Sequence, residues 1–195
     1  MKKIIVVLLC LFTFSPAFAK TINFEDLAGD IITPIPDGYN DLRWNSSNIT
    51  GVVNINPFLV PGVNYASLQN NALFNANGLL APNTTIISAV SGTFDFLSGY
   101  WSAGLSGKAD IKFEGYANNQ LVYASNTYSL NSDSVAPILL NWYGIESLSI
   151  LSSADVWIAD AFEVNTNPSS VPLPGAIWLL GSAVLGFAGF RKKSI

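Results

Sequence analysis

The chain has no histidine, and its one cysteine, Cys10, lies within the first twenty residues. The absence of histidine excludes Ser-His-Asp and Cys-His nucleophilic sites, imidazole general bases and His metal sites. Metal chemistry would therefore depend on oxygen ligands, which favour calcium or magnesium. The sequence also has no G-x-S-x-G motif, and the spacing of its 13 Asp and Glu residues selects no glycosidase-type pair. We therefore expect that the protein is not an enzyme.

Basic side chains are few in the middle of the chain. Residues 20–170 hold all 13 acidic side chains and four basic ones, a net charge of −9, and the other five basic side chains lie at the two ends. An acidic domain is a poor partner for nucleic acid or another polyanion in direct contact. We therefore expect no nucleic-acid partner, and a ligand that is a neutral sugar, a cation, or an anionic polymer reached through bound calcium.

The N-terminus has the three parts of a secretory signal peptide. Two lysines, Lys2 and Lys3, precede the apolar stretch 4–14, and Ala17-Phe18-Ala19 fits the small-x-small cleavage rule. We predict a signal helix over residues 1–19 that the Sec machinery reads and that is cut after Ala19. Cleavage removes Cys10, so the mature chain has no disulfide.

An uncharged apolar segment lies close to the C-terminus. Residues 174–190 contain no charged side chain, and with Leu173 the segment has 18 residues, about 27 Å as a helix. This length is just enough to cross a bilayer core of about 30 Å, and the basic residues that follow keep their end in the cytoplasm. The alternative is a buried core helix, which would rarely lack a polar face. We predict a transmembrane helix over residues 174–190 and a basic tail over 191–193.

The order of a proline motif, an apolar helix and a basic cluster resembles the PEP-CTERM sorting signal. The resemblance covers Val171 to Lys193 of a predicted sorting signal over residues 171–195, and its name-giving Pro-Glu-Pro is a Pro-Leu-Pro variant here. The motif residues are Val171, Pro172, Leu173 and Pro174, with Arg191, Lys192 and Lys193 at the far end.

The resemblance implies a route through the cell envelope of a Gram-negative bacterium. The ectodomain would be periplasmic while the helix anchors the protein in the inner membrane. An exosortase would then cut near the proline motif, and the protein would continue to the cell surface or the extracellular matrix.

The intervening region has the pattern of a single all-β domain. No part of it keeps a helical period, and short apolar stretches alternate with turn residues. We predict an antiparallel, jelly-roll-like β-sandwich over residues 20–164 and a polar linker over 165–170. Residues 57–84 are rich in Pro and Asn, so we expect long loops there, with room for a short strand or a helical turn. The expected strands are 21–24, 49–55, 86–90, 92–100, 109–116, 120–124, 137–143, 147–151 and 156–164.

Three carboxylates of the first and last strands are candidate calcium ligands. Asp160 falls in register with the apolar residues 156, 158, 162 and 164, and an inward carboxylate is costly unless it is paired or binds a cation. First and last strands are often neighbours in sandwiches. We expect Glu25, Asp26 and Asp160 to share a structural Ca²⁺. The alternative is that the strand ends before Asp160, or that Asp160 caps a loop.

Aromatic side chains are the second candidate site. Sugar rings stack on exposed aromatic rings, while Asn and Asp bind the hydroxyl groups. We expect Tyr39 and Trp44 in a turn-rich loop, and Tyr100 and Trp101 at a strand end, to bind carbohydrate. The alternative is that such residues belong to the core, because aromatics are favoured in strands.

These observations predict an exported surface or matrix protein whose ectodomain binds exopolysaccharide. Two alternatives remain open: a non-binding structural component of the cell surface or biofilm matrix, and a polysaccharide-degrading enzyme.

Overall fold

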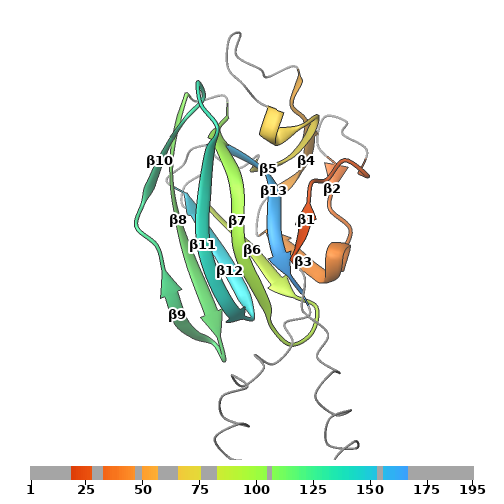
Figure 1. The fold of residues 1–195 in the computed structure, drawn as a ribbon, viewed down its shortest axis with the longest axis vertical. Coiled ribbons are helices and arrows are strands. Elements are labelled where there is room, and N and C mark those ends of the chain that lie inside the picture. Colours follow the sequence, from red (N-terminus) through yellow and green to blue (C-terminus); the bar gives the residue numbers. More distant parts are fainter. Residues whose placement is uncertain are drawn as a thin grey trace, which may run out of the picture. The chain divides into compact units, whose positions relative to one another are not determined.

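The computed structural model describes residues 19–27, 33–46, 50–56, 66–75, 83–104, 107–152 and 156–166. Within them the chain forms two antiparallel sheets (Figure 1). The predicted all-β antiparallel sandwich is confirmed. No helix in these ranges is both long and apolar enough to cross a membrane. The predicted signal peptide, the helix 174–190 and the basic tail lie outside the described residues.

The first sheet is ordered β11-β7-β13-β5-β4-β2, and β1 also pairs with β13. Because β1 and β13 are antiparallel neighbours, with Ile22 opposite Phe162, the two ends of the domain come together. The strands of this sheet are β11 (Ala136–Ile145), β7 (Phe94–Ala103), β13 (Trp157–Asn165), β5 (Asn71–Asn75), β4 (Thr50–Asn54), β2 (Thr33–Pro34) and β1 (Lys20–Ile22).

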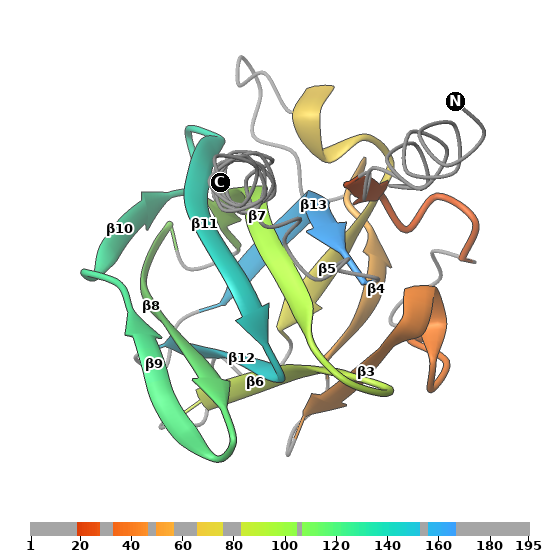
Figure 2. The same ribbon diagram turned by 60° about the horizontal axis from the view of Figure 1, so that its bottom comes forward.

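The second sheet is ordered β10-β8-β12-β6-β3, and β9 lies beside β10 along the same side of β8 (Figure 2). Successive strands alternate between the sheets from β5 to β8 and again from β10 to β13, as in jelly-roll sandwiches. The strands are β10 (Tyr128–Asn131), β8 (Lys108–Ala117), β12 (Ser147–Ser152), β6 (Asn83–Ala89), β3 (Leu42–Ser46) and β9 (Gln120–Ala124).

Aromatic rings fill the space between the sheets. Trp101 of β7 lies at the centre, with its ring centroid 5.0 Å from Phe113, 5.2 Å from Trp157 and 5.3 Å from Phe162. All four side chains are fully buried. Because buried aromatic rings each remove a large apolar area from water, this cluster is a main source of the domain's stability.

A second, smaller cluster covers the outer face of the first sheet. It contains Val53, Ile55, Leu68, Ala72 and Ile158. Leu68 comes from the short 3₁₀ helix η3 (Ala66–Leu68), which packs over β13 and β7. The first sheet is therefore buried on both faces in this region.

β13 changes its alternation halfway along. Ala159 and Phe162 both face the central core, whereas Ile158 faces the outer cluster. A bulge at Ala161, with φ of 50°, shifts the register between them. The single apolar face predicted for residues 156, 158, 162 and 164 is therefore wrong for its first half.

Candidate functional site

Asp160 is the least expected side chain of the sandwich. Its carboxylate is 0% exposed, and neither oxygen has a hydrogen-bond partner. It follows Ile158 by two residues and pairs in register with Tyr100, so alternation places it on the outer face of the first sheet. Burial raises its pKa to about 8; the Ala161 amide lowers that pKa, and the charge of Glu25 raises it further. A buried carboxylate without partners needs a proton or a cation.

Glu25 lies in the turn that follows β1, and it connects that turn to β5. Its Oε1 accepts the main-chain amides of Asn70 at 2.9 Å and Asn71 at 2.7 Å, and its Oε2 accepts the Asn70 side-chain amide at 3.2 Å. The pairing of β1 with β13 holds this turn beside the bulge of β13. Glu25 is close enough to Asp160 for its charge to act on the pKa of that carboxyl.

Asp26, the third predicted metal ligand, has a different partner. Its Oδ1 accepts a hydrogen bond from the Tyr39 hydroxyl at 2.5 Å. Burial, this hydrogen bond and the charge of Asp26 raise the pKa of Tyr39 above its usual range, and the charge of Asp160 adds to the rise. Tyr39 therefore stays neutral and holds Asp26.

The fit of these residues to a calcium ion is partial. In the described ranges, no group of three or more His, Cys, Asp or Glu side chains is arranged to hold a metal ion. Yet the unpartnered oxygens of Asp160 are the hard ligands that calcium prefers, and Glu25 supplies a second carboxylate. An ion here would be held by Asp160 and Glu25, and main-chain carbonyls would complete its oxygen shell.

Two of the four predicted sugar-binding residues form one aromatic cluster. The rings of Tyr39 and Trp44 pack on Phe24, with centroids 6.0 Å and 5.4 Å from it. Trp44 also stacks on Phe162 at 6.2 Å, and its indole N–H donates to the Tyr39 carbonyl at 3.0 Å. Both side chains are half-buried, so they present only part of their rings.

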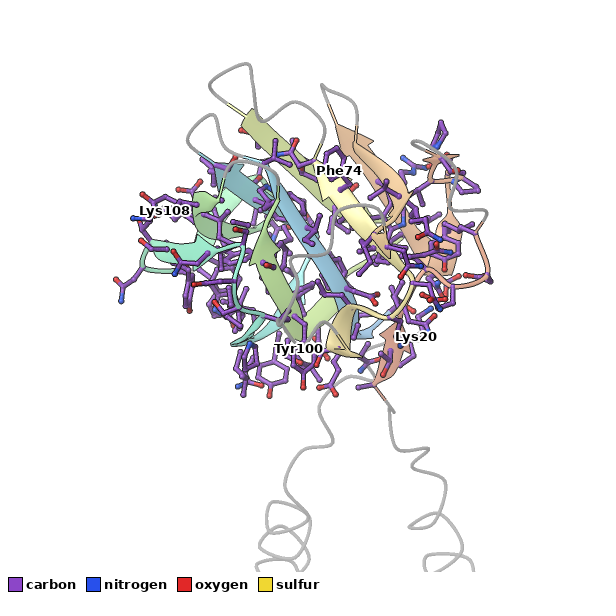
Figure 3. The ribbon with its side chains drawn as sticks, turned by 90° about the horizontal axis from the view of Figure 1, so that it is seen from above. Lys20, Phe74, Tyr100 and Lys108 are labelled. Atoms are coloured by element: carbon purple, nitrogen blue, oxygen red, sulfur yellow. The ribbon has the colours of Figure 1, made fainter. Side chains whose placement is uncertain are left out.

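The other two residues, Tyr100 and Trp101, are separated by strand alternation. Trp101 is fully buried between the sheets, so its assignment to carbohydrate binding is wrong. Tyr100 points the opposite way, is 37% exposed, and lies at the periphery of the domain (Figure 3). Of this pair, only Tyr100 can meet a ligand at the surface.

The most exposed aromatic residue of the described ranges was not among the predicted sugar-binding residues. Tyr143 of β11 is 58% exposed, and its neighbour Trp142 is buried under Tyr123 of β9. The sequence held little signal for it, because β9 and β11 contain no charged residue but neither do six other strands of the described fold. In an acidic domain, two uncharged strands with exposed apolar side chains indicate a surface suited to an uncharged ligand.

The fold defines an antiparallel β-sandwich protein, and the C-terminal region identifies the class of sorting signal. Residues 170–193 match the model of the PEP-CTERM protein-sorting motif. The chain therefore carries a PEP-CTERM sorting signal, which confirms the resemblance found in the sequence. This signal belongs to proteins that Gram-negative bacteria export by the exosortase route.

No curated protein matches the sequence. Among solved structures, a family 29 carbohydrate-binding module is similar at 12% identity and a TM-score of 0.42, over 73% of this chain and 96% of that chain. The cleaved adhesin domain of Lys-gingipain is similar at 8% identity and a TM-score of 0.40, over 75% and 97%. The family 32 module of C. perfringens NanJ, in complex with galactose, is similar at 13% identity and a TM-score of 0.34, over 62% and 95%. These distant likenesses carry no information about a ligand of this chain.

Proposed function

We propose that this chain is a surface or extracellular-matrix protein whose β-sandwich binds exopolysaccharide after exosortase processing. The observation that carries the proposal is the matched sorting motif at residues 170–193, directly behind a folded acidic domain. The Sec machinery would export the chain, the helix 174–190 would hold it in the inner membrane, and the exosortase would release it. The sandwich would then act at the cell surface or in the matrix.

Support for sugar binding comes from the charge of the domain and from its exposed tyrosines. With a net charge of −9 over residues 20–170, the domain repels anionic polymers, so a neutral polysaccharide is favoured. Tyr100 and Tyr143 are both exposed and uncharged, and each can stack on the C–H face of a sugar ring.

The second candidate function is a non-binding structural component of the surface or matrix. It is favoured by the burial of Trp101, Trp157 and Phe113, which use much of the aromatic content of the domain for its core. The polysaccharide-degrading alternative gains nothing from Asp160, because this carboxyl is fully buried and cannot reach a sugar.

We also propose that Asp160 and Glu25 bind a structural Ca²⁺. The proposal is supported by the two unpartnered oxygens of Asp160 and by the proximity of Glu25. The ion would neutralise a buried charge and would fix the turn after β1 against β13. In this role calcium stabilises the fold and does not contact the sugar.

Co-sedimentation of the full chain in detergent with the producer's exopolysaccharide tests this function. We expect binding both with calcium and with a chelator at a temperature where the chelated protein is folded. Binding that is lost in chelator without unfolding would show that calcium bridges protein and sugar. The absence of binding under both conditions would favour the structural component.

A further inference from the structure

We propose that the edge formed by β9 and β11 is the binding surface for an uncharged polysaccharide, with Tyr143 and Tyr123 as the stacking residues. This inference rests on the proposed function and names the site that performs it. The two strands, Gln120–Ala124 and Ala136–Ile145, are referred to below as the uncharged edge. They lie on the same side of the sandwich in both ribbon views (Figures 1 and 2).

The uncharged edge carries most of the exposed large hydrophobic side chains of the described residues. Of the seven exposed large hydrophobic side chains there, four belong to these two strands. They are Leu121 (53% exposed), Val122 (47%), Leu139 (64%) and Tyr143 (58%). Because exposed apolar side chains on a soluble domain are costly when they gather in one region, their concentration in these two strands makes the edge a candidate interaction site.

The aromatic part of the edge is held rigid by its own packing. The ring of Tyr123 stacks on Trp142 at 5.3 Å and 11°, and its hydroxyl donates to the Tyr143 carbonyl at 3.4 Å. Gly115 of β8 makes room for the stack, since a Cβ there would lie 3.1 Å from Trp142 and 3.3 Å from Tyr123. The Tyr123 ring is fixed in this way, so it loses little conformational entropy when a ligand stacks on it.

The chemistry of the edge selects the class of ligand. Fifteen residues without a charge offer no ion pair to an anionic polymer and no carboxylate to a bridging cation. Aromatic and aliphatic surfaces fit the C–H faces of sugar rings, and the exposed amides of Asn141 and Gln120 can bind hydroxyl groups. A neutral polysaccharide fits this surface, because it carries no charge and offers both C–H faces and hydroxyl groups.

The alternative occupant is a second copy of the chain, added as a strand to β11. The backbone of β11 disfavours this pairing, because its register breaks twice, between Leu139 and Trp142 and between Trp142 and Ile145. Asn141 and Gly144 have φ of 52° and 66° at these breaks. Such bulges prevent the regular ladder that strand addition needs.

The test compares Tyr143→Ala with Tyr100→Ala in the full chain solubilised in detergent. Both replace an exposed strand tyrosine, so both variants should fold, and near-UV circular dichroism verifies this. The probe is the neutral fraction of the producer's exopolysaccharide, with alginate as the anionic comparison. We expect Tyr143→Ala to weaken binding of the neutral fraction about tenfold, as the loss of one aromatic stacking contact predicts. Ile86→Ala, which truncates an exposed side chain of β6 outside the uncharged edge, and Tyr143→Phe should both stay within about twofold of wild type.

Each other outcome has a distinct meaning. If wild type binds the neutral fraction and Tyr143→Ala binds it equally well, the inference is overturned while the proposed function stands. If Tyr100→Ala is the variant that loses binding, the site lies on the face of Tyr100 and the inference is again wrong. If wild type binds neither polymer, both the inference and the proposed function fail. A change of oligomeric state in Tyr143→Ala, seen by size exclusion without a change in binding, would assign the edge to self-association.

Discussion

At the scale of single residues, Asp160 and Trp101 show how burial separates structural side chains from functional ones. Both are fully buried, and both contain polar atoms without a hydrogen-bond partner. For Trp101 the free-energy cost comes from one buried indole N–H without a hydrogen bond. The packing of the ring against Phe113, Trp157 and Phe162 offsets this cost. For Asp160 both carboxylate oxygens lack a hydrogen bond, and the nearby Ala161 amide offsets the cost of burial only in part. A bound cation would supply the missing compensation for the buried carboxylate.

The calcium proposal predicts opposite effects of Asp160→Asn in the two ionic conditions. In chelator above about pH 8, where Asp160 is ionised, the substitution removes a buried unpaired charge and should raise the free energy of unfolding by about 1–3 kcal/mol. With calcium, wild type should gain about 3 kcal/mol at a hundredfold excess over Kd, and the variant should gain nothing. Thermal unfolding with calcium and with EGTA measures both effects.

Asp26→Asn is the matched control for this prediction. Asp26 is exposed and accepts the Tyr39 hydroxyl, so the amide variant should keep the calcium response. If Asp26→Asn abolishes the response as well, all three carboxylates bind the ion. If calcium leaves the wild-type unfolding temperature unchanged, the calcium proposal is wrong.

At the scale of elements, the contact between β7 and β13 depends on a glycine. A Cβ at Gly99 would lie 2.6 Å from Cδ1 of Phe162. The Phe162 ring cannot easily move, because it packs on Phe24, Trp44, Phe96 and Trp101. The bulge at Ala161 turns this ring into the core, and Gly99 gives it space.

Gly99→Ala is therefore expected to lower the free energy of unfolding by about 1–3 kcal/mol, as overpacking does. Urea denaturation of the full chain in detergent measures the loss. Phe162→Leu should create room for the added methyl group, so the double variant should be more stable than the sum of the two single changes predicts. Strict additivity would show that Gly99 and Phe162 do not press on each other.

The long strands were predictable because their pattern is local. β9 was expected at its observed bounds, β8 differs from its expected range by one residue at each end, and β12 differs by one residue at its C-terminal end. The short strands β2, β3 and β10 were not expected. β5 is the short strand left open for the Pro- and Asn-rich region, and its exact place was not predictable because its hydrogen bonds come from β4 and β13, which are distant in sequence. Tertiary pairing of this kind overrides local propensity.

The candidate site was predictable to a smaller extent, and two residues show why. The expected meeting of the first and last strands places Glu25 near Asp160, as the pairing of β1 with β13 requires. The register of Asp160 depends on a bulge at Ala161, and nothing about an alanine indicates a positive φ. Adjacent Tyr100 and Trp101 necessarily point to opposite faces, but their identities do not tell which one is buried.

At the scale of the whole molecule, the folded domain ends very close to the sorting signal. Asp41 fastens both ends of the domain, since its Oδ2 accepts Lys20 Nζ at 3.1 Å and the Thr166 hydroxyl at 3.2 Å. The predicted linker, 165–170, therefore begins inside the domain, because β13 continues to Asn165. Four residues, 167–170, separate Thr166 from the motif at Val171, which gives a reach of about 17 Å when the five steps are extended. An exosortase that cuts at the proline motif, as proposed, would therefore act within a few residues of the folded sandwich.

This arrangement predicts how the chain responds when the motif is changed. Replacing Pro172 and Pro174 with alanine removes the recognition element but leaves the apolar helix 174–190 in place. The full-length form should then accumulate in the inner membrane, while the wild-type chain is converted to a shorter, released form. Pro168→Ala is the matched control, because it changes a proline in the linker and should leave processing unchanged.

A fractionation time course with an antibody against the sandwich follows both forms. Wild-type chain that stays full-length in the inner membrane while the exosortase is present would refute processing, and equal release of the Pro172/Pro174 variant would show that the enzyme reads another part of the signal.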